Sequence, residues 1–172
     1  MTSKDFKKII LDKIKEVLKQ RHFKKSGQSF KYSNGDLTYY VDLQSSTSST
    51  MTELKVTVNT GIASELLYRL EEKAITSHLR GHFRKRIGDY LTLPRDTWWT
   101  VNDTETAITT ANEIANIIYK KVWIEFEQIT STEDLIELWL KGMCFGLSDY
   151  TRQEYLVMLN GAKEAERKSS GI

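Results

Sequence analysis

The chain has 172 residues, of which 40% are hydrophobic and 28% are charged, a composition typical of a globular domain with a buried core. Its one cysteine excludes an internal disulfide framework and favours a reducing compartment. Residues 1–18 alternate lysines with apolar residues, unlike a signal peptide, and no stretch has the length and apolarity of a membrane span. The sequence therefore predicts a cytoplasmic protein without membrane association.

The net charge of +2 is unevenly distributed along the chain. Residues 1–35 carry ten Lys and Arg against three acids, and residues 78–95 carry five against one. Residues 96–172 reverse this balance, with seven Lys and Arg against thirteen acids. The basic and acidic segments either neutralise one another in the folded chain or form a charge dipole, and both alternatives stay open.

The N-terminal part predicts one helix followed by three strands. Apolar residues recur at three- and four-residue spacing over residues 6–18, after an expected N-cap at Ser3. From about residue 23 the period changes to two, and Asn34-Gly35 is a strong hairpin signal because both residues tolerate positive φ. Alternating apolar residues then predict strands over 37–44 and 54–59, so we expect an antiparallel meander.

The C-terminal part is predicted to be mainly helical. Residues 64–80 show helical spacing, and Asn102-Asp103-Thr104-Glu105 is typical of a capping box that opens a long helix. Two further helices are expected before residue 162, and the polar segment 163–172 is expected to be a disordered tail. The sequence thus predicts a single α+β domain over residues 1–162. It combines an antiparallel β-sheet of about four strands with an N-terminal helix and C-terminal helices.

Histidine and cysteine offer little sign of catalysis. His78 and His82 stand four residues apart, as metal ligands on one helix face do, but Leu79 occupies the place of the glutamate that metalloproteases require. We expect both histidines to be partly exposed and incidental, and we expect no metal or cofactor. Cys144 lies among apolar residues without the signature of a thiol enzyme, and we expect it to be buried.

The order of the N-terminal elements suggests an alternative function. A helix followed by three strands resembles the arrangement of the PD-(D/E)xK nucleases, in which two acids hold a divalent metal and a lysine polarises the attacking water. Here Asp42, Glu53 and Lys55 would take these roles. An acid two residues before a lysine occurs four times in the chain, so the motif has low specificity. The alternative requires the three side chains to converge on one metal ion.

The basic stretch 80–86 suggests a second alternative, which is nucleic-acid binding. It contains four Lys and Arg for phosphate contacts, with His82 and Phe83 interleaved for stacking on bases. The sequence pI of about 8.5 is lower than that of a dedicated nucleic-acid-binding domain. The acidic residues of 96–172 also offer partners for these cations, so nucleic-acid binding is not the favoured function.

Several short motifs follow one another in a recognisable order: Phe23, Gly27 and Phe30; Gln44-Ser45; Asn59-x-Gly61; Arg86-Ile87-Gly88; and Trp98-Trp99. In these motifs, over about residues 5–125, the chain resembles the bacterial family called domain of unknown function 4304. It departs from that family at His22, where Gly is usual, and at Ile87, where Leu is usual. The cysteine often found before the Arg-x-Gly step is also absent. The resemblance implies an α+β fold and no activity.

The residues that carry this resemblance suit hydrogen bonding and packing better than acid–base catalysis. We therefore predict a non-catalytic binding module, of the toxin-neutralising or immunity type among others, whose partner is another protein. The predicted binding residues are Gln44, Asn59, Arg86, Trp98 and Trp99. Adjacent tryptophans on a strand point to opposite faces, so we expect one in the core and the other towards a partner. The oligomeric state stays open.

Overall fold

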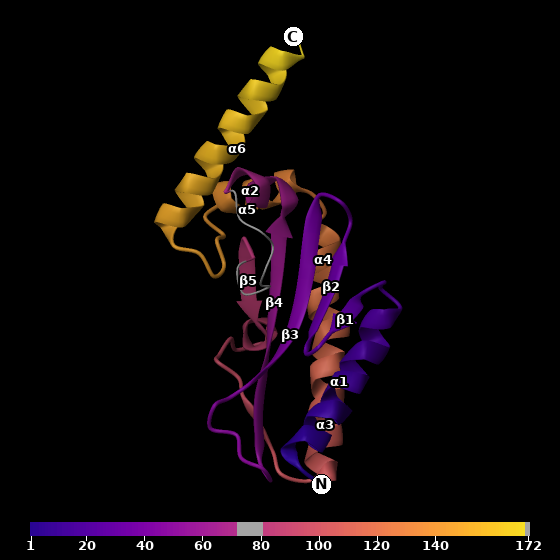
Figure 1. Cartoon of the computed structure of the whole chain (residues 1–172). Coiled ribbons are helices and arrows are strands. Elements are labelled where there is room, and N and C mark those ends of the chain that lie inside the picture. Colours follow the sequence, from indigo (N-terminus) through magenta and orange to yellow (C-terminus); the bar gives the residue numbers. More distant parts are fainter. Residues whose placement is uncertain (72–80, 171–172) are drawn as a thin grey trace.

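An antiparallel sheet forms the centre of the fold. The computed structural model describes residues 1–71 and 81–170, and these residues confirm the α+β class (Figure 1). They form a six-stranded sheet in the order β1-β2-β3-β4-β5, with β6 paired to β4 beside β5. The strands are β1 (Lys24–Ser26), β2 (Ser29–Ser33), β3 (Leu37–Ser45), β4 (Leu54–Ser64), β5 (Phe83–Arg86) and β6 (Trp99–Val101).

The predicted meander is confirmed as β2, β3 and β4. Gly35 has a φ of 99°, and the Asn34 side chain accepts a hydrogen bond from the backbone N–H of Leu37 at 2.7 Å, so this turn needs both residues. The sheet exceeds the expected four strands because β1 pairs with β2, and β5 and β6 pair with successive parts of β4. None of these three strands is long enough to show a clear alternation of apolar and polar residues in the sequence.

Three of the described helices cover one face of this sheet. The described helices are α1 (Ser3–Lys19), α2 (Glu65–Leu70), α3 (Thr104–Ile117), α4 (Trp123–Gln128), α5 (Thr132–Leu140) and α6 (Asp149–Ser169). A 3-10 helix η2 (Ile87–Tyr90) follows β5, and a π-helix η3 (Ile118–Val122) lies between α3 and α4. α1, α3 and α4 lie together on one side of the strands (Figure 1). Their apolar residues and those of the sheet form the core, in which Ile14, Val41 and Ile114 are completely buried.

The helix ends differ in part from the expectations. α1 is capped by Thr2 rather than Ser3, and α3 by Asp103 rather than Asn102, because the Asp103 carboxylate accepts the backbone N–H of Thr106 at 2.7 Å. Of the helix predicted over 64–80, α2 covers 65–70, and 72–80 lie outside the described residues.

α6 continues through most of the segment predicted to be a disordered tail. Residues 163–169 are helical, and the Ala, Glu, Lys and Arg residues that dominate them are strong helix formers. Lys163 also lies 3.0 Å from Glu133 of α5. The far end of α6 projects away from the rest of the molecule (Figure 1). Among the described helices, none combines the length and apolarity of a membrane span.

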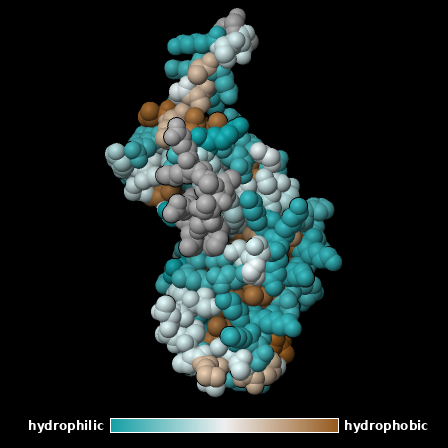
Figure 2. Space-filling model, viewed as in Figure 1, coloured by the Kyte–Doolittle hydropathy of each residue, from teal (hydrophilic) through white to brown (hydrophobic). Residues whose placement is uncertain are grey.

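The side of the sheet that faces away from α1, α3 and α4 is called the polar face here. Strand register and alternation place on it Ser29 and Lys31 of β2; Thr38, Tyr40, Asp42 and Gln44 of β3; Lys55, Thr57 and Asn59 of β4; and Arg84 and Arg86 of β5. Figure 2, seen from the same side as Figure 1, shows mainly hydrophilic residues over the visible strands. This face carries most of the residues that the sequence nominates for binding.

Candidate binding site

Arg86, at the end of β5, is held by two residues of the segment before β6. Its Nη1 donates a hydrogen bond to Asp96 Oδ1 at 2.7 Å, and its guanidinium carbon lies 5.5 Å from the centre of the Trp98 ring. Trp98 Nε1 donates to the other carboxylate oxygen of Asp96 at 3.2 Å. The hydrogen bond from Arg86 lowers the pKa of Asp96, so this carboxyl stays ionised at neutral pH. These three residues are called the Arg86 cluster.

A pair of side-chain amides lies next to the Arg86 cluster. Asn59 of β4 is aligned with Arg86 of β5 in the strand register. Its Nδ2 donates a hydrogen bond to Gln44 Oε1 on β3 at 2.9 Å. Four of the five predicted binding residues are therefore gathered on the polar face: Gln44, Asn59 and Arg86 on three neighbouring strands, and Trp98 against Arg86 just before β6.

Trp99 is the predicted residue that lies elsewhere. It packs against the core on the helix side of the sheet, and its Nε1 donates to Glu113 Oε2 of α3 at 2.9 Å. Trp98 is the outward tryptophan of the pair, as the alternation of a strand requires. Trp99 thus connects β6 to α3 and takes no part in the polar face.

A pocket of about 330 Å³ lies beside the Arg86 cluster. Its lining residues are Tyr40, Asn59, Thr60, Arg84, Lys85, Arg86 and Gly146. Tyr40 on β3 and Arg84 on β5 are both aligned with Gly61 of β4, which has no side chain to fill the space between them. The Arg84 guanidinium donates to the Gly146 carbonyl, and the Arg84 backbone N–H donates to the Phe145 carbonyl at 2.9 Å. The segment before α6 therefore forms one wall of the pocket.

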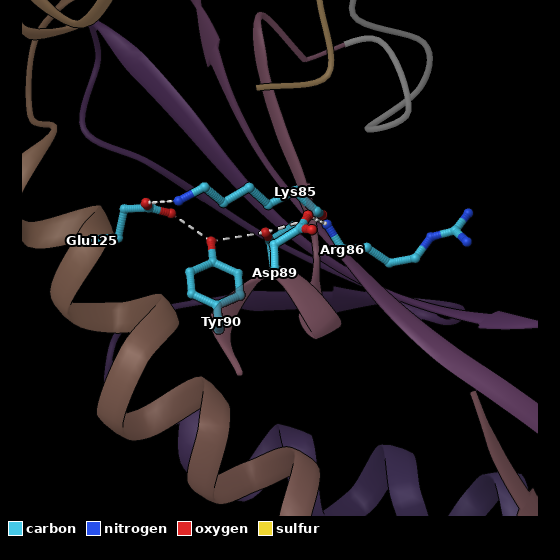
Figure 3. A network of polar contacts seen from close by, with 6 residues as sticks. Lys85, Arg86, Asp89, Tyr90 and Glu125 are labelled. Carbon is cyan, nitrogen blue, oxygen red and sulfur yellow. Dashed lines mark hydrogen bonds and ion pairs between the residues drawn. The ribbon is translucent and has the colours of Figure 1, made fainter. Parts of the chain in front are cut away.

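Lys85 points in the opposite direction from Arg86 (Figure 3). Its ammonium group forms an ion pair with Glu125 of α4 and lies 4.1 Å from the centre of the Phe145 ring. The Tyr90 hydroxyl donates to the second Glu125 oxygen at 2.5 Å. Burial, followed by the neighbouring Glu125 charge, raises the pKa of Tyr90 well above its usual value. This network connects β5 to α4 on the helix-covered side of the sheet.

The cations of the basic stretch are thus engaged within the protein. Lys85 and Arg86 pair with Glu125 and Asp96, which both belong to the acidic segment 96–172. Arg84 is held at the Gly146 carbonyl. Arg80, the first cation of the proposed nucleic-acid site, lies outside the described residues. In the described part of this stretch, the cationic side chains bind groups of the protein itself. They do not form the row of outward cations that phosphate binding would require.

The three residues of the nuclease alternative do not converge. Asp42 is aligned with Asn59, whereas Lys55 lies four positions earlier on β4, about 13 Å away along a strand. Glu53 is exposed before the start of β4. Asp42 is buried and accepts a hydrogen bond from Ser29 Oγ at 2.6 Å. Within residues 1–71 and 81–170, no group of three or more His, Cys, Asp or Glu side chains could hold a metal ion.

His82 and Cys144 differ from their expected environments. His82 is completely buried, and its Nδ1 accepts the backbone N–H of Ser64 at 2.9 Å, where β4 ends and α2 begins. Its Nε2 lies 3.4 Å from Glu71 Oε2. His78 lies outside the described residues. Cys144 is partly exposed rather than buried, with its Sγ 3.9 Å from Asp149 Oδ1.

Sequence reasoning did not identify Asp96, Tyr40 and Arg84 as parts of this site. For Arg84 the available signal was its spacing of two residues from Arg86, because residues two apart on a strand share a face. Asp96 lies in an irregular segment without periodicity, so nothing in the sequence relates it to Arg86. Tyr40 belongs to a strand that the sequence predicts, but the space beside it depends on the pairing with Gly61.

The comparisons with known proteins give a family and no activity. Residues 14–128 match the family model described as Domain of unknown function (DUF4304). No curated protein and no solved structure matches the chain. The matched range includes the meander, the Arg86 cluster, α3 and α4, whereas Gly146 and the last two helices follow it. Since the match spans more than half of the sequence, the chain belongs to the DUF4304 family of domains of unknown function.

Proposed function

We propose that this protein is a non-catalytic binding module that docks a protein partner on its polar face. The observation that carries the proposal is the fixed orientation of Arg86, which is held by Asp96 and lies against Trp98 while 37% of its side chain is exposed. Arginine and tryptophan contribute most strongly to the affinity of protein interfaces. An arginine that is already oriented also loses less side-chain entropy when a partner binds.

The Gln44–Asn59 pair supports the same function. Asn59 lies next to Arg86 and is bonded to Gln44, and both amides present hydrogen-bonding groups rather than ionisable ones. Such groups give direction and specificity to a contact without contributing acid–base chemistry. We place this function in the bacterial cytoplasm, in agreement with the single cysteine of the chain. A toxin-neutralising or immunity-type role needs only a binding surface of this kind.

The proposal is tested by capturing partners on the immobilised protein and on the double variant Arg86→Ala/Trp98→Ala. Arg167→Ala serves as a matched control because Arg167 is exposed near the end of α6, far from β5 along the chain. A partner found with the unmodified protein is then purified and titrated against all three proteins. We expect the double variant to weaken binding about 100-fold, the effect of losing a hot-spot pair, and the control to leave the affinity unchanged.

Two results would contradict the proposal. The double variant could bind the purified partner as tightly as the unmodified protein, which would place the interface elsewhere. Alternatively, the purified protein could turn over a substrate while no partner is retained, which would make it an enzyme.

A further inference from the structure

We infer that the pocket between Arg84 and Arg86 is a carboxylate-binding subsite that receives an Asp or Glu side chain of the docked partner. That the carboxylate belongs to a protein partner rests on the function proposed above, whereas the preference for a carboxylate rests on the pocket itself. Nothing in the family description assigns a ligand to these residues. The inference extends the binding surface from the Arg86 cluster to the space beside it.

The pocket brings hydrogen-bond donors to a common wall. Arg84 and Arg86 are two residues apart on β5, so their side chains leave the strand on the same face about 7 Å apart. Asp96 is the one hydrogen-bond partner of the Arg86 guanidinium within the described part of the chain, and a guanidinium has five N–H groups. Asn59 uses one of its two amide N–H groups for Gln44. Donors therefore remain for a planar, bidentate acceptor.

The charged lining of the pocket is cationic. Within the described part of the chain, the charged residues that line it are Arg84, Lys85 and Arg86. Lys85 is paired with Glu125 on the other side of the sheet, and Asp96, the ion-pair partner of Arg86, does not belong to the lining. The lining therefore favours a negatively charged ligand.

The nearby Asp96 carboxylate disfavours a phosphate group. A phosphate monoester carries a charge of about −1.5 to −2 at neutral pH, which is larger than the single charge of a carboxylate. Asp96 stays ionised and would therefore repel a phosphate more strongly than a carboxylate. The pocket volume of about 330 Å³ and the buried Tyr40 ring beside it suit the methylene groups of an acidic side chain. A glutamate or aspartate therefore fits better than a free phosphate.

The test uses N-acetyl-glutamate amide as the ligand, with N-acetyl-glutamine amide as its uncharged counterpart. Each is titrated at millimolar concentration into the full-length protein while amide chemical shifts are followed by NMR. We expect the glutamate compound alone to shift Asn59, Arg84 and Arg86. Arg86→Gln should weaken binding about tenfold, the usual loss with one charge-assisted hydrogen bond. Arg167→Gln should have no effect.

A second variant separates loss of binding from loss of structure. Asn59→Asp keeps the size of the side chain and both arginines but adds a negative charge to the pocket. We expect it to abolish binding of the glutamate compound while the NMR spectrum shows a folded protein. Unchanged affinity in the folded Asn59→Asp variant would overturn the inference.

Two further results would also overturn it. The glutamine compound could shift the same residues equally, which would exclude a charge-dependent site. Inorganic phosphate could bind where the glutamate compound does not, which would identify a phosphate site.

The outcomes distinguish the subsite from the proposed function. If the glutamate compound fails to bind but the Arg86→Ala/Trp98→Ala variant loses its partner, the subsite is rejected and the docking function stands. If the compound binds while the same variant keeps its partner, the docking face is rejected. The pocket is then a site for a free carboxylate, and the partner-derived side chain is excluded.

Discussion

At the scale of single residues, Tyr39 makes the fold sensitive to alkaline pH. Its ring is buried in the core, and its hydroxyl donates a hydrogen bond to the Ile129 carbonyl at 2.8 Å. Burial raises the pKa of Tyr39 to about 12, from an ordinary value of 10.0. The folded protein therefore holds this proton more tightly than the unfolded chain does. Its contribution to stability is complete below pH 10 and is lost as the pH rises towards 12.

We predict that the free energy of unfolding falls between pH 10 and pH 12, with Tyr39 accounting for a loss on the order of 2 kcal/mol. Urea unfolding at a series of pH values measures this slope. Tyr39→Phe should cost about 1 kcal/mol at neutral pH through the lost hydrogen bond, but it should flatten the alkaline slope. Burial raises the pKa values of Tyr40 and Tyr155 in the same direction, so part of the slope should remain. An unchanged slope in Tyr39→Phe would contradict this assignment.

At the scale of elements, the 3-10 helix η2 and the segment after it position the Arg86 cluster. The Gly88 carbonyl accepts the backbone N–H groups of Leu91 and Arg95, both at 3.3 Å, and thereby folds this segment back on itself. A Cβ atom on Gly88 would overlap the Arg95 carbonyl oxygen and lie 2.8 Å from Thr97 Oγ1. The residues that would be displaced flank Asp96, so the glycine controls where the partner of Arg86 lies.

We therefore predict that Gly88→Ala destabilises the protein by about 1–3 kcal/mol and weakens partner binding, as we expect of Arg86→Ala/Trp98→Ala. Gly161→Ala is the matched control, because Gly161 lies in α6 with no atom within 4 Å of an added Cβ. That change should stabilise the helix by about 0.5–1 kcal/mol. Thermal unfolding and partner titration measure the two effects. Equal stability and affinity in both variants would show that the Gly88 loop does not position Asp96.

The same elements show what sequence reasoning can reach. The meander was predictable because Asn34-Gly35 and the alternation after it are local signals. The pairing of β5 and β6 with one strand was not, because it joins residues far apart in the chain through short segments without a regular period. Arg86 and Trp98 were nominated from their residue types, but the carboxylate that joins them depends on the Gly88 fold. His82 was misjudged because its acceptor role depends on the distant N–H of Ser64.

At the scale of the whole molecule, the helices beyond the family match complete the upper end of the structure. The matched range ends at residue 128, and α5 and α6 follow it. Tyr155 of α6 contacts the rings of His82 and Trp139, at 5.1 and 5.8 Å between ring centres. Leu159 of α6 is completely buried. The first half of α6 is therefore part of the core, and the pocket wall at Gly146 is held between this half and α5.

The second half of α6 makes few such contacts, which leads to the last prediction. A chain ending at Asn160 keeps Leu156 and Leu159 and loses, among the described residues, only exposed or partly exposed ones, together with the surface ion pair of Lys163 and Glu133. Its unfolding free energy should change by no more than about 0.5 kcal/mol. A chain ending at Ser148 exposes Trp139 and His82 and should lose at least about 3 kcal/mol, the contribution of two buried leucines. Urea unfolding followed by tryptophan fluorescence measures both changes. Equal losses in the two shortened chains would mean that the projecting half of α6 contributes to stability as much as the packed half does.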